Sequence, residues 1–303
     1  EDEDGGGWLV AGGGKRSWKR RKGKTGSGRP GNAHKRTKKT SGVEQIVWDP
    51  TVLDEEVDER TAAALNARTR EAQKVLRESA FHDQLCSSAL GRGEAGEGPS
   101  LLSGLGSVEE MVVYGLGSLE HGPPACKYQF ALAVVLAEDL LRSDKLDRVL
   151  FFDPAFTAYD RRVIEGANPK FCVMRENENC ARTAFRKTLF YMPHCEAVLY
   201  NALLGANWDS DRLPNLVILG NSFASYKTIL GRPSGSGFGV EYPKLFSAAR
   251  CSREVPVPTS FNLTEASAFN DMSFHFFPRE AVADALDEIC LLYTSPSPRD
   301  PIG

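Results

Sequence analysis

The chain has 303 residues, of which 41% are hydrophobic and 25% charged, an ordinary composition for a folded protein with a buried core. No apolar stretch approaches the roughly 20 residues that a membrane helix needs, so the sequence predicts no membrane association. The net charge of −3 conceals an asymmetry, because residues 15–39 hold 12 Lys and Arg and no acid, while the remainder is acidic. An acidic body is a poor general binder of nucleic acid.

The cysteine pattern indicates a reducing compartment. Seven cysteines are scattered along the chain without a CxxC pair, and the start of the chain does not resemble a secretory signal. We therefore expect reduced thiols in an intracellular protein.

Residues 1–43 are predicted to form a disordered basic tail. They contain almost no aliphatic residues and cannot bury enough surface to offset the entropy lost on ordering. Two basic clusters, 15–24 and 34–39, are typical of a nuclear import signal or a nucleic-acid-binding tail, and equally of a solvated tail with neither role. We expect a protein of the nucleus and cytoplasm that contacts nucleic acid only through Lys15–Lys39.

Residues 44–107 are predicted to form a helical extension followed by a linker. Acidic residues at 54–56 suit the start of a helix, and a loose apolar stripe runs through 52–88. We expect one or two helices there, docked on the body of the protein. Glycine and serine in 89–107 predict a linker or surface loop.

Residues 108–290 alternate apolar strands with helices. The first unit, EMVVYGLGSLEHG at 110–122, predicts a strand and a tight glycine turn, with a helix over 124–142 after it. Further strands are predicted at 147–154, 170–176, 188–193 and 214–221, an antiparallel edge strand at 268–278, helices at 157–166, 194–205 and 279–289, and a loop at 231–242. This pattern predicts an α/β fold of three layers, with a mostly parallel sheet covered on both faces. Residues 291–303 resemble a translated cloning adapter, and we expect a non-native tail there.

Polar residues follow the predicted strands at the points where the strands end. The candidate ligand-binding residues are Gly115, Gly117, Ser118, Asp153, His194, Cys195, Asn221 and Ser222. If the strands are parallel, all of them share one edge of the sheet, where loops build the site. We expect a pocket there for a small anionic ligand, since glycine N–H groups suit an anion and a carboxylate suits hydroxyl groups. The alternative is that these side chains only cap local backbone.

The motifs do not decide which ligand or reaction this edge of the sheet would serve. GLGSLEHG does not have the G-x-G-x-x-G spacing of a dinucleotide site, and Asp153 comes later than the acid of that motif. YMPHC at 191–195 lies where amino-methyltransferases carry an Asn/Asp-Pro-Pro-aromatic motif, although Met192 and His194 depart from it. Cys195 as a nucleophile would need a nearby base, and the His and Cys residues lack a recognised zinc spacing. No catalytic residue and no metal site is assigned.

Several of these motifs together resemble the domain family named for the plant phenotype "sensitivity to red light reduced". The resemblance extends over residues 110–277. It is carried by Gln129 and by VVYGLGS, FFDPAFTAYD, LFYMPHC, NALLGANW, LVILGNSF and AFNDMSFHFF, at 112–118, 151–160, 189–195, 201–208, 216–223 and 268–277. The matching positions include Pro154, Pro193, Asn207, Trp208 and Gly220 besides the site residues above.

The resemblance implies a Rossmann-like fold and a regulator with protein partners. The implied roles are circadian-clock input and red-light signalling in plants, and haem-biosynthesis regulation, clock-gene expression and cytoskeletal stability in animals and fungi. The family has no established catalytic residues. The alternative is an enzyme at the same edge, such as an S-adenosylmethionine-dependent methyltransferase or another nucleotide-ligand enzyme. S-adenosylmethionine, a nucleotide and haem are therefore the ligands to consider.

Overall fold

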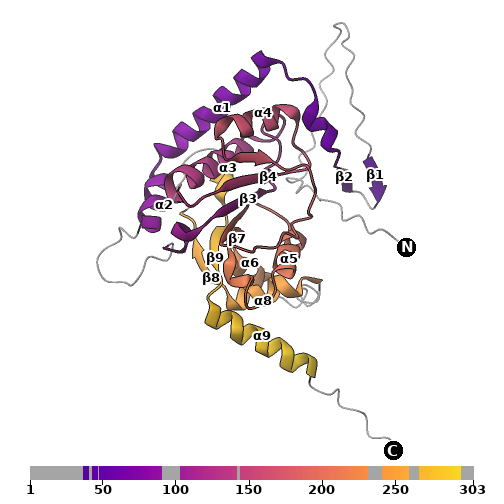
Figure 1. The fold of residues 1–303 in the computed structure, drawn as a ribbon, viewed down its shortest axis with the longest axis vertical. Helices are drawn as coiled ribbons and strands as arrows, with labels where there is room; N and C mark the ends of the chain where they lie inside the picture. The colour runs from indigo at the N-terminus through magenta and orange to yellow at the C-terminus, as the bar shows by residue number, and fades with distance from the viewer. Residues whose placement is uncertain are drawn as a thin grey trace, which may run out of the picture.

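The computed structural model describes residues 37–40, 43–46, 48–90, 103–141, 144–230, 241–258 and 266–294. A seven-stranded sheet in the order β5-β4-β3-β6-β7-β9-β8 lies between two layers of helices (Figure 1). The predicted α/β fold with a mostly parallel sheet is confirmed. No helix in the described part of the chain is long and apolar enough to span a membrane.

Five neighbouring strands are parallel, as their near-continuous apolar sequences predict. They are β3 (Glu110–Tyr114), β4 (Arg148–Phe152), β5 (Phe171–Val173), β6 (Thr188–Met192) and β7 (Leu216–Asn221). The chain runs outward from β3 through β4 to β5 and then returns to the other side of β3 as β6. Ligands of such sheets bind where this order reverses, outside the carboxyl ends of the strands. Here that point lies between β3 and β6.

The strand predicted at 268–278 is β9 (Met272–Phe276), antiparallel as expected but not at the edge of the sheet. Its outer side pairs with β8 (Arg253–Pro256), which forms the edge. The sequence analysis missed β8 because REVP is short and charged and ends in a proline, which donates no hydrogen bond to a neighbouring strand.

One face of the sheet is covered twice. Next to the sheet lie α3 (Pro124–Val135) and α4 (Ala158–Ala167), and α1 (Glu59–Arg77) packs against both from outside, followed by α2 (Ala80–Leu90). This outer cover explains why α3 is apolar all round, with every residue from Phe130 to Val135 buried. The helical extension predicted over 52–88 is therefore present. Arg77, the last residue of α1, bonds Glu138 (2.8 Å) and Asp139 (3.1 Å) in the π-helical turn after α3.

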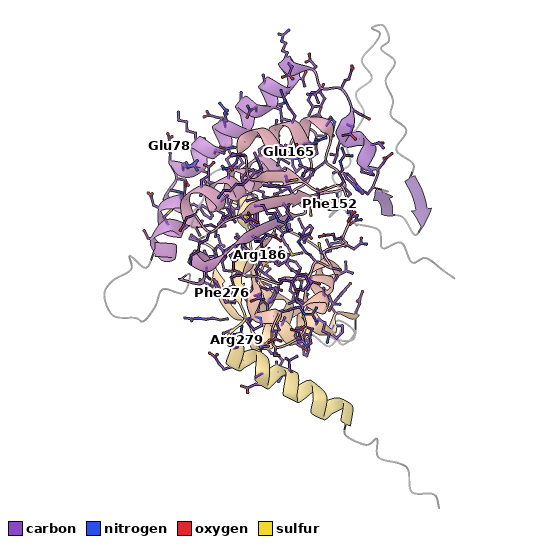
Figure 2. The ribbon with its side chains drawn as sticks, in the orientation of Figure 1. Glu78, Phe152, Glu165, Arg186, Phe276 and Arg279 are labelled. Carbon is purple, nitrogen blue, oxygen red and sulfur yellow. The ribbon has the colours of Figure 1, made fainter. Side chains whose placement is uncertain are left out.

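The other face is covered by α5 (Ala197–Ala206), α6 (Phe223–Leu230), α8 (Pro243–Cys251) and α9 (Arg279–Thr294). Figure 2 shows side chains filling the space between the sheet and both helical layers. The sequence analysis missed α6 and α8, which are only a few turns long. The helix predicted from 194 begins at Ala197, because His194 has a positive φ of 54° that no helix allows. The last helix extends past the predicted boundary at 290.

The segment between β5 and β6, residues 174–187, contains no helix, although parallel strands are usually joined by one. It crosses the sheet as irregular chain with a turn at Asn179 and Cys180, and Asn207 at the end of α5 holds it there. The Asn207 amide accepts the Ala184 N–H (2.7 Å) and donates to the Arg182 carbonyl (2.8 Å). This side chain is fully buried.

The terminal segments differ partly from their predictions. A hairpin of β1 (Thr37–Thr40) and β2 (Val43–Ile46) lies where the sequence predicted the end of the disordered tail. A 3-10 turn (Ser103–Ser107) ends the predicted linker. Residues 1–36, 91–102, 231–240 and 295–303, which hold the rest of the predicted tail, linker, loop and non-native end, lie outside the described residues.

Candidate functional site

The glycine turn after β3 requires both of its glycines. Gly115 and Gly117 have φ of 75° and 70°, in the left-handed region that favours glycine. A Cβ at Gly115 would lie 2.6 Å from the Cys195 thiol, and one at Gly117 would lie 3.0 Å from the Cys126 thiol. The turn is therefore set by its own backbone and by close packing against two cysteines.

Asp153 follows β4 and bonds β4 to the glycine turn. Its carboxylate accepts the N–H of Gly117 (2.7 Å) and the N–H of Ala155 (2.8 Å). Burial raises the pKa of Asp153 to about 6, against the two backbone hydrogen bonds, which act to lower it. Both carboxylate oxygens thus serve the protein's own backbone.

Ser118 and Asp160 hold the residues that follow the glycines. The Ser118 hydroxyl accepts the N–H groups of Glu120 (3.2 Å) and His121 (3.0 Å). Asp160 forms a capping box with Thr157 at the start of α4, and its other oxygen accepts the Glu120 N–H (2.9 Å). Burial raises the pKa of this fully buried carboxyl group. Asp160 therefore both caps α4 and holds the turn after β3.

His194 and Cys195 follow β6 and turn away from each other. The His194 side chain is exposed, and its Nε2 lies 3.1 Å from the Ala268 carbonyl. The Cys195 thiol is buried and lies 3.6 Å from the Tyr114 carbonyl. Burial raises the pKa of this thiol well above its ordinary value, whereas a nucleophilic cysteine needs a lowered one. The geometry therefore offers no support for catalysis by Cys195.

Asn221 links the end of β7 to the same edge. Its Nδ2 donates to the Cys195 carbonyl (3.0 Å), and its backbone N–H donates to the Tyr200 hydroxyl (2.8 Å). Its Oδ1 is buried without a hydrogen-bond partner among the described residues. Ser222 points elsewhere, toward the carboxylate of Glu254 on β8 (2.5 Å).

The predicted edge thus brings some of the candidate residues into contact and leaves others apart. Gly117 contacts Asp153, and Gly115, Cys195 and Asn221 form a second connected group, whereas His194 and Ser222 bond other segments. The predicted ligand pocket remains a prediction. Cavities of about 490, 520 and 620 Å³ lie elsewhere in the described structure.

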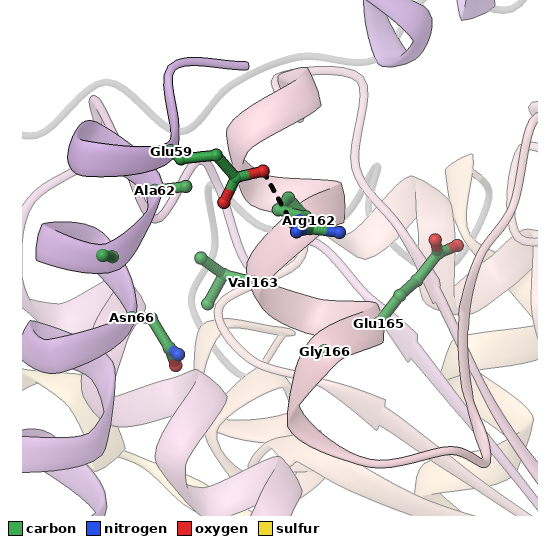
Figure 3. A pocket seen from close by; sticks show the side chains of 8 residues that line it. Glu59, Ala62, Asn66, Arg162, Val163, Glu165 and Gly166 are labelled. Carbon is green, nitrogen blue, oxygen red and sulfur yellow. Dashed lines mark hydrogen bonds and ion pairs between the residues drawn. The ribbon is translucent and has the colours of Figure 1, made fainter.

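Two of these cavities lie away from the carboxyl edge and are lined by charged residues. The 520 Å³ cavity is a groove between α1 and α4, bridged by the ion pair of Arg162 with Glu59 (Figure 3). The 620 Å³ cavity lies at the opposite edge of the sheet and contains three arginines that the sequence analysis did not single out. Among the described residues, no cluster of three His, Cys, Asp or Glu side chains could hold a metal ion.

Comparison with known proteins matches this chain to a family. The model of the SRR1 domain matches residues 73–276. Protein SENSITIVITY TO RED LIGHT REDUCED 1 of Arabidopsis thaliana is 31% identical over 229 residues, which cover 74% of this chain and 78% of that protein. SRR1-like proteins of Drosophila melanogaster and Mus musculus are 28% and 33% identical, over 60% and 54% of this chain and 59% and 74% of their own lengths.

Similar solved structures include the plantazolicin methyltransferase BpumL in complex with a pentazolic desmethylPZN analog and SAH. It is 10% identical with a TM-score of 0.27, over 80% of this chain and 96% of its own. A likeness at that level carries no argument about function.

Proposed function

Because this chain belongs to the SRR1 domain family of regulatory proteins, we propose that it regulates a light response or the circadian clock by binding partner proteins rather than by catalysis. The relative named for reduced sensitivity to red light supports the choice of a light response. In an organism other than a plant, the same proposal is that the protein regulates haem synthesis and clock-gene expression. Nuclear and cytoplasmic localisation is part of it, with Lys15–Lys39 as the import signal.

The observation that carries the non-catalytic proposal is how the polar groups at the carboxyl edge are used. Asp153, the acid placed to hold a ligand's hydroxyl groups, accepts two N–H groups of its own chain. The Cys195 thiol is packed against Gly115 and carries a raised pKa. Groups already engaged in this way hold the loops of this edge in place and have little capacity left for chemistry.

Expression in Arabidopsis plants that lack SENSITIVITY TO RED LIGHT REDUCED 1 tests the regulatory role. The chain should restore red-light sensitivity, and the Gly115→Val variant, which cannot fit beside Cys195, should not. Plants that accumulate the unaltered chain and stay insensitive would refute the light-response proposal.

A specific observation favours a second candidate function, the binding of a small ligand at the same edge. The Asn221 Oδ1 and the Tyr191 hydroxyl are both buried without hydrogen-bond partners among the described residues. Burial raises the pKa of the Tyr191 hydroxyl, and the neighbouring Cys195 and Cys126 side chains act in the same direction. Buried polar atoms of this kind are commonly satisfied by a water molecule or a ligand.

A thermal-shift screen of the full chain decides between the two functions. The probes are S-adenosylmethionine, ATP and haem. A ligand at 100 times its dissociation constant adds about 2.7 kcal/mol of stability, which gives a clear rise in melting temperature. A rise that is lost in the Asn221→Leu variant would establish the ligand function, whereas unchanged melting with every probe supports the regulator alone.

A further inference from the structure

The amino edge of the sheet, opposite the glycine turn, carries a charged cluster at three aligned strand starts. Glu110 of β3 is in register with Arg148 of β4 and Thr188 of β6. Because side chains alternate along a strand, Glu110 is on the same face as the buried Val112 and Tyr114, the face that residues 174–187 cross. The cluster therefore lies between the sheet and that crossing segment.

Three arginines converge on the Glu110 carboxylate. Arg148 donates from Nε at 2.7 Å, Arg182 from Nε at 3.2 Å and Arg186 from Nη2 at 3.1 Å. Burial acts to raise the pKa of Glu110, but hydrogen bonds and charges from the arginines lower it below its ordinary value. A single buried carboxylate thus fixes three guanidinium groups.

The three arginines have N–H donors that are not used by Glu110. Arg182 also bonds Glu178 (2.6 Å) and Arg186 also bonds Asp147 (3.0 Å). Arg148 bonds only Glu110 among the described residues, and its side chain is 48% exposed. Each guanidinium group carries five N–H donors, so several of them remain free to bind an acceptor in the cavity.

The crossing segment adds an apolar contact to these charges. Phe185 is 85% exposed, more than any other large hydrophobic residue that the structure describes. Its backbone is held in place because the Asn207 amide bonds Ala184 and Arg182, which directly precede it in the chain. Phe185 and the three arginines line the same cavity of about 620 Å³. Arg186 is labelled in Figure 2.

We propose that this arginine cavity, formed by Arg148, Arg182, Arg186 and Phe185, binds a short acidic segment of a partner protein in which Asp or Glu adjoins an apolar side chain. Planar guanidinium groups bind carboxylates through two parallel hydrogen bonds. Aromatic residues and arginine are both enriched at protein interfaces, and this cavity presents both. The site lies apart from the carboxyl edge and holds whether or not that edge takes a ligand.

The charge balance favours an acidic peptide over nucleic acid. Outside residues 1–4 and 15–39 the chain holds 36 Asp and Glu against 25 Lys and Arg. Glu178 and Asp147 stand next to the arginines, so a continuous phosphate backbone would be repelled. A peptide with one or two carboxylates brings less negative charge to these acids than a phosphate backbone does, and Arg148 has neither of them as a partner.

Peptide selection on the full chain tests the proposal. A display library of random linear peptides is panned against the immobilised protein, and the recovered peptides are synthesised with a fluorescent label for binding assays. The test variants are Phe185→Ser, which removes an exposed side chain, and Arg148→Gln, which leaves Glu110 with two arginines. Phe246→Ser is the matched control, since this phenylalanine is 38% exposed on α8.

We expect the recovered peptides to combine Asp or Glu with an adjacent aromatic or aliphatic residue. Each test variant should weaken their binding at least about tenfold, equal to about 1.4 kcal/mol, and the control should not. The melting temperature should be unchanged for Phe185→Ser, whose side chain is exposed, which separates lost binding from lost stability. Peptides without acids, or peptides that bind the test variants as well as the unaltered chain, would overturn the proposal. So would a labelled oligothymidine probe whose binding depends on Phe185 and Arg148, because it would assign the cavity to nucleic acid.

Discussion

Replacing Asp153 with Asn should change how the stability of the protein depends on pH. Burial raises the pKa of Asp153 from 3.8 to about 6 in the folded state. An acid with a raised pKa stabilises the folded state fully below its unfolded pKa, and this contribution is lost as pH rises through the folded pKa. The shift of about two pKa units corresponds to about 3 kcal/mol, at about 1.36 kcal/mol per unit. Asn has no such titration.

The assay is urea unfolding at intervals from pH 4 to pH 7, followed by tryptophan fluorescence. The unfolding free energy of the unaltered protein minus that of Asp153→Asn should fall by about 2.4 kcal/mol across this range, because part of the contribution is already lost at pH 4. Other groups cancel in the difference, including His275, whose pKa burial lowers to about 4. Asp58→Asn is the control, because hydrogen bonds from Thr61 lower the pKa of Asp58, so that its contribution is lost only at lower pH and the difference should stay nearly constant across this range.

A difference between the unaltered protein and Asp153→Asn that stays constant with pH would refute the reasoning. It would mean that the carboxylate is hydrated and faces an open pocket. In that case the candidate ligand site, rather than an internal brace, would be the correct description of the edge.

Three further predictions follow from named contacts. Gly115→Ala should lower the unfolding free energy by about 1–3 kcal/mol, the cost of a strained backbone, and adding Cys195→Ala should recover part of it by removing the thiol 2.6 Å from the new Cβ; no change in urea unfolding would contradict this. Asn207→Ala should lower the unfolding free energy by about 2–4 kcal/mol, because its buried partners lose their hydrogen bonds, and Asn215→Ala, which removes a single bond to Ala184, should lower it by about 1 kcal/mol. Equal losses of unfolding free energy in urea would be inconsistent with the bracing role of Asn207. Alanine substitution in the basic clusters should reduce the nuclear fraction of a fluorescent fusion, and an unchanged fraction would leave the tail without an import role; the residues to replace are Lys19, Arg20, Arg21, Lys35, Arg36, Lys38 and Lys39.

The sequence predicted best where the signal is local. The strand, glycine turn and helix at 110–142 were recognisable because an apolar run, two glycines and a helical pattern follow one another. Short elements with mixed composition, such as α6, α8 and β8, give no such pattern. The place of β9 inside the sheet was wrong, because strand order depends on contacts between distant segments and not on local sequence.

The candidate site shows the same division. That Asp153 and Asn221 lie at the carboxyl edge followed from the end of each strand, but their partners did not. Asp153 bonds Gly117, which is 36 residues away, and Glu110 gathers Arg182 from 72 residues away. No local pattern reports such pairs, so the arginine cavity could not be found before the fold was known. The family was recognised from its motifs and not from the spacing of single residues. The family match at 73–276 extends the resemblance from residues 110–277 into α1 and α2.

Amide hydrogen exchange at Gly117 and Ala155 tests most directly whether the carboxyl edge is closed by the protein's own groups. Both N–H groups donate to the buried Asp153 carboxylate. The full chain is measured alone and with S-adenosylmethionine, ATP or haem. We predict that both amides exchange as slowly as those of β3 and that no ligand alters the rate. Fast exchange in the free protein that slows when one of these ligands is added would contradict the account and make this edge a binding site.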